Sequence, residues 1–477
     1  MTTTSRPTAD QEDPETMATT ANPTSNGRPD ARAARRALPV VEPDAGLVER
    51  AVYVDEDVYR DELERVFARA WLYLGHDSQI PEPGDYMTTF MGEDPVILVR
   101  GTDGQVRAFL NACRHRGMRV CRAEEGNTSF FRCPYHAWTY ATDGSLRGVP
   151  KFREAYEGTM AKRDWGLVQV ARIESRYGLL FGAWDEDAPS LGEYLGGFAV
   201  YLDLIFGRAK GGLEVIGGAH KWTIETNWKH PAENFACDMY HVESAHQRPA
   251  ELGLMEPLEL GGYEISAGLG YVGHQHNRPL SSDGVDDGVP ISAYWTMPNP
   301  YTYVLHEQRA AMALELGEQL ARMIPLGHAT IFPNFSLLDT ESFRLIRVVH
   351  PLAPGRSMVY QWCIVESDLD PEVRDAVRKQ YILAFGPAGL LEQDDGENWR
   401  ECQNGMSGTV GRRVKTNMGL GLGQDTTATE LLGTEAPGAG GGIWSEANQR
   451  QFYRHWRAFM ESESWETLRP RLSDVSF

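Results

Sequence analysis

The sequence predicts an α+β fold, because successive parts of the chain carry different hydrophobic patterns. A helical spacing of apolar residues begins at Tyr59, and residues 85–185 then show short alternating runs typical of antiparallel strands. From about residue 190 onward, helical and strand-like patterns are mixed. At 477 residues the chain is also too long for one simple core, so we expect two domains.

Each element follows from its local pattern. "YRDELERVFARAWLYLG" predicts a helix, whereas "DPVILVRG" and "VRAFLNAC" predict strands. In the last part, "PEVRDAVRKQYILAF" and "SEANQRQFYRHWRAFMES" predict helices, and "RLIRVVHPL" and "SMVYQWCIVES" predict strands. The glycine-rich "TEAPGAGGGIW" is expected to be a surface loop, since no Lys-Ser/Thr follows its glycines as in a phosphate-binding loop. Residues 1–38 are polar without an apolar period and predict a disordered tail.

Charge and cysteine content exclude several classes of protein. The formal net charge of -21 argues against general binding to nucleic acid or to anionic membranes, since both need a positive surface. No apolar run reaches the roughly 18 to 20 residues that a membrane span needs. Six cysteines are too few for a disulfide scaffold of this length, so a reducing, cytoplasmic environment is expected.

Two short segments of the β region each present one cysteine and one histidine. Cys113-x-His115 is followed, after seventeen residues, by Cys133-x2-His136. One interpretation is a Cys2His2 zinc site, but zinc fingers pair Cys with Cys and His with His. Mixed pairs are what a Rieske [2Fe–2S] cluster needs, because two thiolates hold one iron and two imidazoles hold the other. The spacing therefore favours a Rieske cluster.

The residues around these pairs agree with that interpretation. Gly117 permits a tight turn after the first pair, and Pro134 favours a turn within the second. Cys121 does not fit the spacing and is expected to be a small buried residue rather than a ligand. Aromatic side chains are expected to shield the cluster from water: Phe130, Phe131, Tyr135, Trp138 and Tyr140.

A second group of polar residues lies in "NWKHPAENFACDMYHVESAHQRP", residues 227–249. At 100° per residue, Asn234, Asp238 and His241 fall within roughly 60° of one another on a helix. His246 is five positions after His241, about 140° away, so both could bind one metal only if the helix loosens between them. The alternative is a pair of surface histidines on an ordinary helix.

A third stretch, "FGPAGLLEQDDGENW" at residues 385–399, supplies a carboxylate. Asp394 and Asp395 follow an apolar run and precede a glycine, which could be a helix end or an acidic turn. Either carboxylate could instead complete a 2-His-1-carboxylate triad, which leaves adjacent positions open on Fe(II) for O2 chemistry.

Together these motifs resemble the large (alpha) subunits of Rieske non-haem iron aromatic-ring-hydroxylating dioxygenases of the naphthalene/biphenyl type. The resemblance covers about residues 45–465 and includes "NWK-x3-EN-x3-D-x2-H-x4-H", "TIFPN", "FGPAG-x2-E-x-DD" and "SEANQRQFYR". It implies an antiparallel-β Rieske domain (70–190) inserted in a larger catalytic domain (39–69 and 191–477). The catalytic domain would contain a central antiparallel sheet flanked by helices.

The resemblance also implies roles for individual residues. The mononuclear iron ligands would be His241, His246 and Asp395. Asp238 would link His241 to the cluster ligand His136 of a neighbouring subunit, and Asn234 would lie near the iron. At the same boundary between subunits, Arg116 would pair with Glu446. The substrate pocket would be lined by five residues, each of which could equally be ordinary core: Phe235, Met239, His328, Phe385 and Leu391.

The activity implied is that of a terminal oxygenase, which uses O2 and electrons to cis-dihydroxylate an aromatic ring to a cis-dihydrodiol. Electrons would come from NAD(P)H through a separate ferredoxin and reductase, because the chain shows no NAD or flavin motif. The assembly implied is an α3 ring, usually α3β3 with a small beta subunit. Alternatives are a monooxygenase or demethylase with the same metals, a Rieske electron-transfer protein without catalytic iron, and a zinc-binding structural protein.

Overall fold

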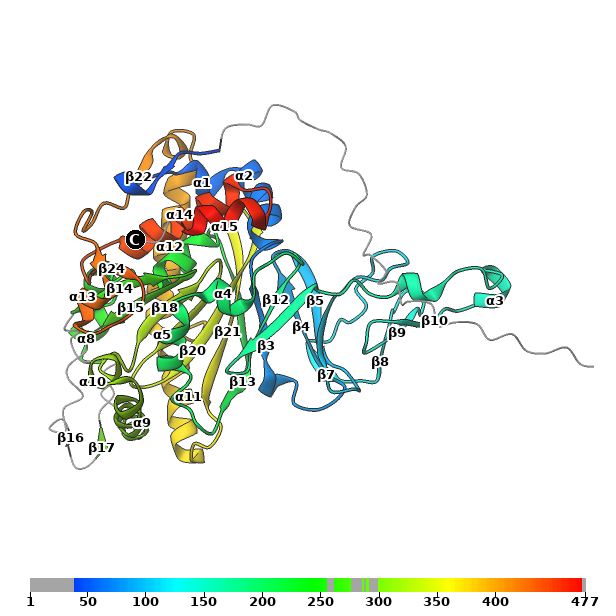
Figure 1. Ribbon diagram of the computed structural model, residues 1–477, viewed down its shortest axis with the longest axis horizontal. Coiled ribbons are helices and arrows are strands. Elements are labelled where there is room, and N and C mark those ends of the chain that lie inside the picture. Colours follow the sequence, from blue (N-terminus) through cyan, green and yellow to red (C-terminus); the bar gives the residue numbers. More distant parts are fainter. Residues whose placement is uncertain (1–37, 255–260, 276–284, 287–288, 291–298, 474–477) are drawn as a thin grey trace, which may run out of the picture. The chain divides into compact units, whose positions relative to one another are not determined.

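The computed structural model describes residues 38–254, 261–275, 285–286, 289–290 and 299–473. The predicted disordered tail, residues 1–38, lies outside the described residues except for its last position. Helices and antiparallel sheets make up the described chain (Figure 1), so the predicted α+β fold is confirmed. Within the described part, no helix is both long enough and apolar enough to cross a membrane.

Residues 72–183 form three small antiparallel sheets. The strand orders are β6-β5-β4-β7, β10-β9-β8 and β11-β12-β3. Their short alternating runs were predicted as antiparallel strands, and the pairing confirms this. The bounds are β3 Leu72–His76, β4 Asp85–Met91, β5 Asp94–Arg100, β6 Val106–Leu110, β7 Glu125–Asn127, β8 Phe130–Arg132, β9 Thr139–Ala141, β10 Leu146–Gly148, β11 Arg172–Arg176 and β12 Leu179–Ala183, with helix α3 at Phe152–Ala155.

A nine-stranded sheet dominates the rest of the chain. Its order is β13-β21-β20-β19-β18-β15-β14-β24-β23, and every neighbouring pair is antiparallel. The bounds are β13 Leu213–Ile224, β14 Gly262–Ala267, β15 Gly270–Gln275, β18 Gly327–Ile331, β19 Phe335–Asp339, β20 Arg344–Ala353, β21 Arg356–Glu366, β23 Thr426–Thr427 and β24 Ala439–Gly442; β16 Val285–Asp286 and β17 Val289–Pro290 form a separate pair.

Helices cover both faces of this sheet. On β15 a Cβ at Gly270 would meet the ring of Phe198, and a Cβ at Gly273 would meet Cys237. Because these glycines are three apart on one strand, they face opposite sides of the sheet. The helices are α4 Leu191–Leu195, α5 Phe198–Ile205, α6 Lys229–Phe235, α7 Val242–Ala245, α8 Gln247–Glu251, α9 Tyr301–Leu316, α10 Glu318–Ala321, α11 Pro371–Phe385, α12 Leu390–Ser407, α13 Ala428–Leu432, α14 Ala447–Glu461 and α15 Trp465–Ser473.

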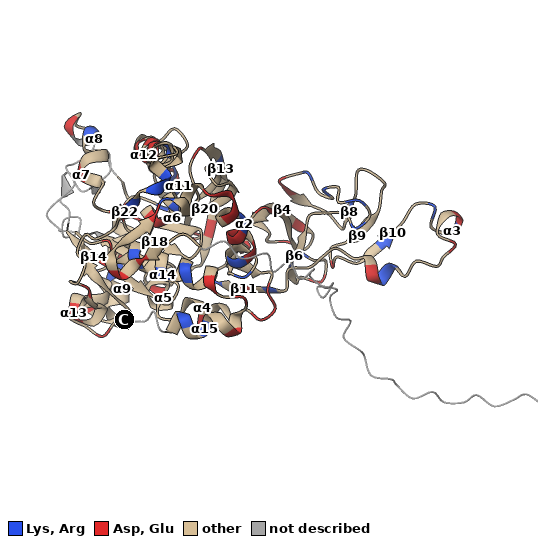
Figure 2. Ribbon diagram, turned by 90° about the horizontal axis from the view of Figure 1, so that it is seen from above, with Lys and Arg blue, Asp and Glu red and all other residues tan. Residues whose placement is uncertain are grey.

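The segment before the three small sheets packs against residues that follow them. Strand β2 (Leu47–Glu49) pairs with β22 (Lys415–Asn417). Figure 2 shows the acidic residues of helix α2 (Glu56–Glu62) in red, and of these only Glu62 is buried. Its carboxylate accepts a hydrogen bond from Lys229 Nζ at 2.5 Å, between two side chains with no exposed area. The segment of the three small sheets is therefore an excursion from a larger structure to which residues before and after it both contribute.

Two predictions about local structure are wrong. The helix expected from Tyr59 to Gly75 comprises α2 and a π-helical turn, Leu63–Phe67, and "LYLGH" then forms β3. The glycine-rich "TEAPGAGGGIW" contains strand β24 rather than a surface loop. At Gly440 a Cβ would lie 1.8 Å from the carbonyl oxygen of Glu264, so only glycine permits this approach of β24 to β14.

A buried histidine lies where β4 packs against the large sheet. The ring of His350 is 5.7 Å from that of Phe90 and 4.9 Å from that of Tyr360. Neither of its ring nitrogens finds a hydrogen-bond partner among the described residues. Burial, assisted by the positive charge of Lys221, lowers the pKa of His350 to about 3.

This shift predicts acid sensitivity. The unfolded imidazole takes up a proton near pH 6.5 and the folded one does not. The contribution of the neutral His350 to the free energy of unfolding is therefore fully present above pH 6.5. It declines by about 1.4 kcal/mol per pH unit as the pH falls from 6.5 towards 3. When the pH is lowered from 7.5 to 5, we expect the free energy of unfolding of the wild type to fall by about 2 kcal/mol more than that of His350→Phe. Denaturant unfolding at both pH values measures the difference, and equal losses would contradict the prediction.

Candidate metal centres

The two Cys-His segments fold into loops of the same conformation. In the first loop the Cys113 amide donates to the Met118 carbonyl, and the Gly117 amide donates to the Cys113 carbonyl, both at 2.8 Å. In the second loop Cys133 and the residues four and five positions after it repeat both bonds, at 3.0 and 2.8 Å. Gly117 and Ala137 occupy the same loop position, and both are left-handed, with φ of 71° and 57°. Each of the two loops therefore presents one cysteine and one histidine from the same backbone conformation.

The sulfur and nitrogen donors of these loops lie in different surroundings. Cys113 and Cys133 are buried, whereas His115 and His136 are partly exposed. The two imidazole rings are 4.5 Å apart at an interplanar angle of 74°, and His115 stacks on Trp138 at 5.1 Å. A centre held by these residues would have its thiolate end inside the domain and its imidazole end towards the surface.

The spacing of these donors fits a cluster of two irons better than one zinc ion. A single tetrahedral ion would bring all four donor atoms within about 4 Å of one another. In the part of the chain that the structure describes, one group of three or more such donors lies within 4.8 Å, and it contains none of these four residues. A [2Fe–2S] cluster needs two separated pairs, sulfur at one end and nitrogen at the other, so the residues fit this cofactor.

The predicted aromatic shield is only partly present. Phe131, Trp138 and Tyr140 are buried together with Cys121, which was predicted to be a small buried residue. The Tyr140 hydroxyl lies 3.2 Å from Cys113 Sγ. The other two aromatic residues do not shield the site: Phe130 is 50% exposed and Tyr135 is 59% exposed. Tyr135 lies against the imidazole end of the site, with its ring 3.6 Å from that of His136.

The second centre begins where a predicted helix breaks. Helix α6 ends at Phe235, and α7 occupies only Val242–Ala245, so the loosening expected between His241 and His246 lies mainly before His241. Cys237 has a φ of 95°, which turns the chain between the two helices. His241 and His246 flank α7 at its two ends, and this single turn brings both rings together.

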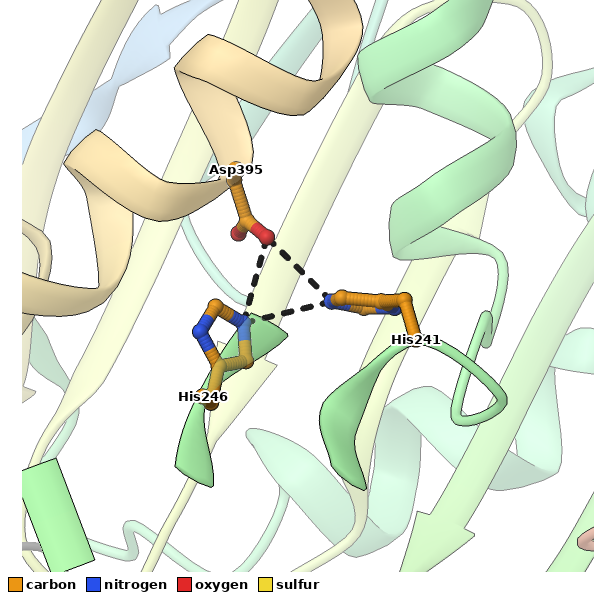
Figure 3. Close-up of side chains that lie close together, drawn as sticks. All are labelled: His241, His246 and Asp395. Atoms are coloured by element: carbon orange, nitrogen blue, oxygen red, sulfur yellow. Dashed lines mark hydrogen bonds and ion pairs between the residues drawn. The ribbon is translucent and has the colours of Figure 1, made fainter. Parts of the chain in front are cut away.

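Three donor atoms converge at this point (Figure 3). His241 Nε2 and His246 Nε2 are 3.2 Å apart, and Asp395 Oδ1 lies 3.2 and 3.1 Å from them, respectively. Octahedral coordination with bonds of about 2.2 Å places neighbouring ligands about 3 Å apart, so this triangle fits one face of such a site. The opposite face would be open to other ligands. The group could therefore hold a metal ion.

The surroundings of the triangle also suit a cation. Asp395 Oδ1 is buried and makes no hydrogen bond within the described residues, although two imidazole nitrogens are near it. Burial disfavours the imidazolium of His241, but the carboxylates of Asp238 and Asp395 outweigh burial and raise its pKa to about 10. Burial alone would raise the pKa of Asp395, yet His246 and His241 hold it below its usual value. The buried Asp395 carboxylate therefore stays ionised.

The second nitrogen of each histidine faces a further polar side chain. His241 Nδ1 lies 3.4 Å from Asp238 Oδ2 and 3.5 Å from Asn234 Nδ2. His246 Nδ1 lies 3.5 Å from Asp394 Oδ2. Carboxylates at this distance fix the orientation of metal-binding imidazoles. The sequence pattern left Asp394 and Asp395 as alternatives, and the structure gives them different positions, one at the converging point and one behind His246.

The position of Asp395 excludes the helix-end interpretation of "EQDDG". Asp395 lies in the second turn of α12, and the helix continues through Gly396 to Ser407. The apolar residues before it become the first buried turn of this helix, which includes Leu391.

The predicted pocket residues are all buried or partly buried, but they form two groups. Phe235, Phe385 and Leu391 share one hydrophobic cluster, and the Phe235 ring is 5.5 Å from that of His328. Met239 instead packs with Cys237, Val242 and Ile443. Burial lowers the pKa of His328 to about 4, so its ring is neutral near pH 7.

The two residues expected at a subunit boundary are far less buried than the pocket residues. The Arg116 side chain is exposed, and Glu446 is partly buried at the start of α14. Glu446 Oε2 accepts a hydrogen bond from the Leu420 amide at 2.9 Å. Their pairing with a second copy stays a prediction.

Comparisons with known proteins extend these findings. Residues 213–462 match the family described as ring hydroxylating alpha subunit (catalytic domain), and residues 70–168 match the Rieske [2Fe-2S] domain. The chain is 38% identical to biphenyl dioxygenase subunit alpha of Paraburkholderia xenovorans over 90% of this chain and 94% of that one. It is 39% identical to benzene 1,2-dioxygenase subunit alpha of Pseudomonas putida, covering 89% and 93% of the two chains.

The fold of this chain is similar to a solved structure of naphthalene 1,2-dioxygenase with indole bound in the active site, with a TM-score of 0.81 and 32% sequence identity. The similarity covers 91% of this chain and 96% of that one. These findings exclude a bare electron carrier and a zinc structural protein, and they confirm the expected pair of a [2Fe–2S] cluster and a mononuclear non-haem iron. The chain therefore belongs to the Rieske-type aromatic-ring-hydroxylating dioxygenase alpha subunits.

Proposed function

We propose that this chain cis-dihydroxylates an aromatic hydrocarbon, taking electrons from NAD(P)H through a separate reductase and ferredoxin. The balance is one arene, one O2, two electrons and two protons giving one cis-dihydrodiol, with both oxygen atoms in the product. The observation that carries the proposal is the triangle of His241, His246 and Asp395, in a chain that also holds two Cys-His loops of the same conformation. When bound, the mononuclear iron supplies the site of O2 reduction and the cluster stores one electron.

The candidate residues are assigned to two metal centres. We assign Cys113, His115, Cys133 and His136 to the cluster. His241, His246 and Asp395 hold the mononuclear iron. Asp238 and Asp394 face the second nitrogens of the two imidazoles and orient the rings, and Asn234 lies beside His241.

Asp238 is suited to connect the two centres of neighbouring subunits. One of its carboxylate oxygens faces His241 Nδ1, and 37% of the side-chain area is exposed. His136 is also partly exposed. A carboxylate can accept an imidazole N–H from each side, so Asp238 could bind His241 and the partner's cluster ligand at once. This arrangement implies a ring of alpha subunits, with Arg116 of one copy near Glu446 of the next.

The walls around the triangle favour an uncharged aromatic substrate. Phe235, Phe385 and Leu391 offer apolar and aromatic surface, as pockets for hydrocarbons do. A substrate carboxylate would need a free cation, and Arg347, whose guanidinium lies 4.3 Å from the Phe235 ring, is already paired with Glu392. Among arenes, we therefore expect hydrocarbons to be preferred over arene carboxylates.

Two measurements test the proposed function. Iron analysis of the purified protein should give three irons per chain, two from the cluster and one mononuclear. Incubation with ferredoxin, reductase, NADH, ¹⁸O2 and a panel of arenes and arene carboxylates should yield a cis-dihydrodiol carrying two labelled oxygens. A product with one labelled oxygen, or a demethylated product, would show the monooxygenase alternative, and two irons per chain would contradict the proposal.

A further inference from the structure

A buried arginine of the large sheet connects the helices next to the mononuclear site. Arg347 lies on β20 directly opposite Gln361 of β21. Its Nε donates to Gln361 Oε1 at 2.7 Å, and one Nη donates to both Gln361 and Glu392. The guanidinium carbon lies 4.3 Å from the centre of the Phe235 ring. Both charged side chains are inaccessible, with 0% and 2% of their areas exposed.

The partners of Arg347 hold the two ends of a short connection. Glu392 is in the first turn of α12, three positions before Asp395, so both side chains lie on the same face of the helix. Gln361 Nε2 donates to the carbonyl oxygen of Phe385, the last residue of α11, at 2.5 Å. Residues 386–389 alone connect α11 to α12. One polar group on the sheet thus contacts the end of α11 and the start of α12.

The connection itself has little freedom to compensate for the loss of either anchor. A Cβ at Gly389 would lie 2.5 Å from the carbonyl oxygen of Ala384, and one at Gly386 would lie 2.6 Å from that of Ile382. The chain turns tightly back on the last turn of α11 before α12 begins. The pairing of Glu392 with Arg347 therefore restrains the first turn of α12, less than one turn before Asp395, whereas Trp399 and Gln403 hold the helix farther along.

We propose that Arg347 is a positioning residue for the mononuclear centre: through Glu392 and Gln361 it fixes the first turn of α12 and thereby places the Asp395 carboxylate, while its contact with Phe235 fixes the adjoining aromatic wall. The proposal rests on the function proposed above. A role in proton transfer does not fit, because a guanidinium keeps its protons and an amide relays none. Direct substrate binding does not fit a cation that is already paired with Glu392.

The same strand offers a matched control. Arg344 is three positions before Arg347, so the two side chains point to opposite faces of the sheet. Arg344 forms an equally buried pair with Glu366, with 0% and 2% of the two side-chain areas exposed, at 2.9 Å. It also contacts Asp339 and the Tyr301 hydroxyl, but neither α11 nor α12 supplies a hydrogen-bond partner. Its removal costs stability in the same way without touching the helix that carries Asp395.

The experiment compares Arg347→Met, the double variant Arg347→Met/Glu392→Leu and the control Arg344→Met. The double variant removes both charges, so it avoids the unpaired buried carboxylate that could prevent Arg347→Met from folding. Three properties are measured on protein with an intact cluster spectrum: the affinity of the mononuclear site for Fe(II), the electron paramagnetic resonance spectrum of its nitric oxide adduct, and the hydrogen peroxide released per O2 consumed.

We expect both Arg347 variants to bind Fe(II) about 10- to 100-fold more weakly, to change the adduct spectrum and to release more peroxide. Arg344→Met should lower the melting temperature but keep the wild-type affinity and spectrum. A double variant with wild-type affinity and spectrum would overturn the proposal, as would equal changes in Arg344→Met. Failure of the proposed function would appear in the wild type itself, as missing mononuclear iron or missing diol, so the two failures are distinguishable.

Discussion

Asp395→Ala is expected to remove the mononuclear iron and lower turnover by at least about 1,000-fold, while the protein keeps its Rieske absorption. Asp395 contributes the only carboxylate oxygen among the three converging donors, and its two histidine neighbours lie 3.1 and 3.2 Å away. Two neutral imidazoles alone do not compensate the charge of a divalent ion, and no described side chain replaces the oxygen at that point. Iron content and visible spectra of the same preparation check both halves of the prediction.

Glu397→Ala provides the control for this variant. Glu397 lies two residues after Asp395 on α12, is exposed, and pairs with Arg400 at 2.7 Å. The Glu397→Ala substitution removes one negative charge from the solvent side of the same helix, so iron content and turnover should stay at the wild-type level. Retention of three irons per chain in Asp395→Ala would contradict the assignment of this carboxylate as a ligand.

Asp238→Asn should leave both metal centres filled and still lower turnover by about 100-fold or more. An amide has nearly the same shape as the carboxylate, so His241 stays in place and the iron stays bound. The amide cannot accept imidazole N–H bonds with both of its polar atoms, so the proposed link between His241 and a partner's cluster is lost. Steady-state turnover, iron content and the rate of electron transfer from the reduced cluster separate these effects.

Asp394→Asn is the matched comparison for Asp238→Asn. Asp394 is the other carboxylate behind an iron-binding imidazole, 3.5 Å from His246 Nδ1, and its side chain is exposed to a similar extent. We expect Asp394→Asn to keep its iron for the same reason, but also to keep electron transfer, because the proposed link to the partner's cluster runs through Asp238 and not through Asp394. Wild-type turnover in Asp238→Asn would contradict the proposed link.

The Cys-His pairs could be recognised from sequence because the loops that present them are local. The backbone hydrogen bonds that close each loop join residues four or five positions apart, so the spacing indicates the turn. The helix at Pro371–Phe385 and the strands β20 and β21 were likewise predicted from uninterrupted local periodicity.

The parts that were not predicted depend on contacts distant in sequence. The helix is interrupted before His241, where Cys237 has a positive φ. The Cys237 sulfur packs against Gly273 of β15, at a position where a side chain would collide with it. Strand β24 exists because Gly440 permits close approach to Glu264. The choice between Asp394 and Asp395 follows from the rotation of α12, whose Glu392 pairs with Arg347 of strand β20. None of these contacts leaves a periodic signal in the sequence.

The pairing of β3 with β12 has a consequence for how this polypeptide could be rebuilt. Leu72 lies opposite Gly182, so the excursion that contains both Cys-His loops leaves and rejoins the larger structure through adjacent, hydrogen-bonded strands. Such adjacent ends are the geometry that modular exchange requires. An electron-storing module of different redox potential could be exchanged between relatives by joining the chain at these two strands, if the contact of Phe90 with His350 of the large sheet is kept.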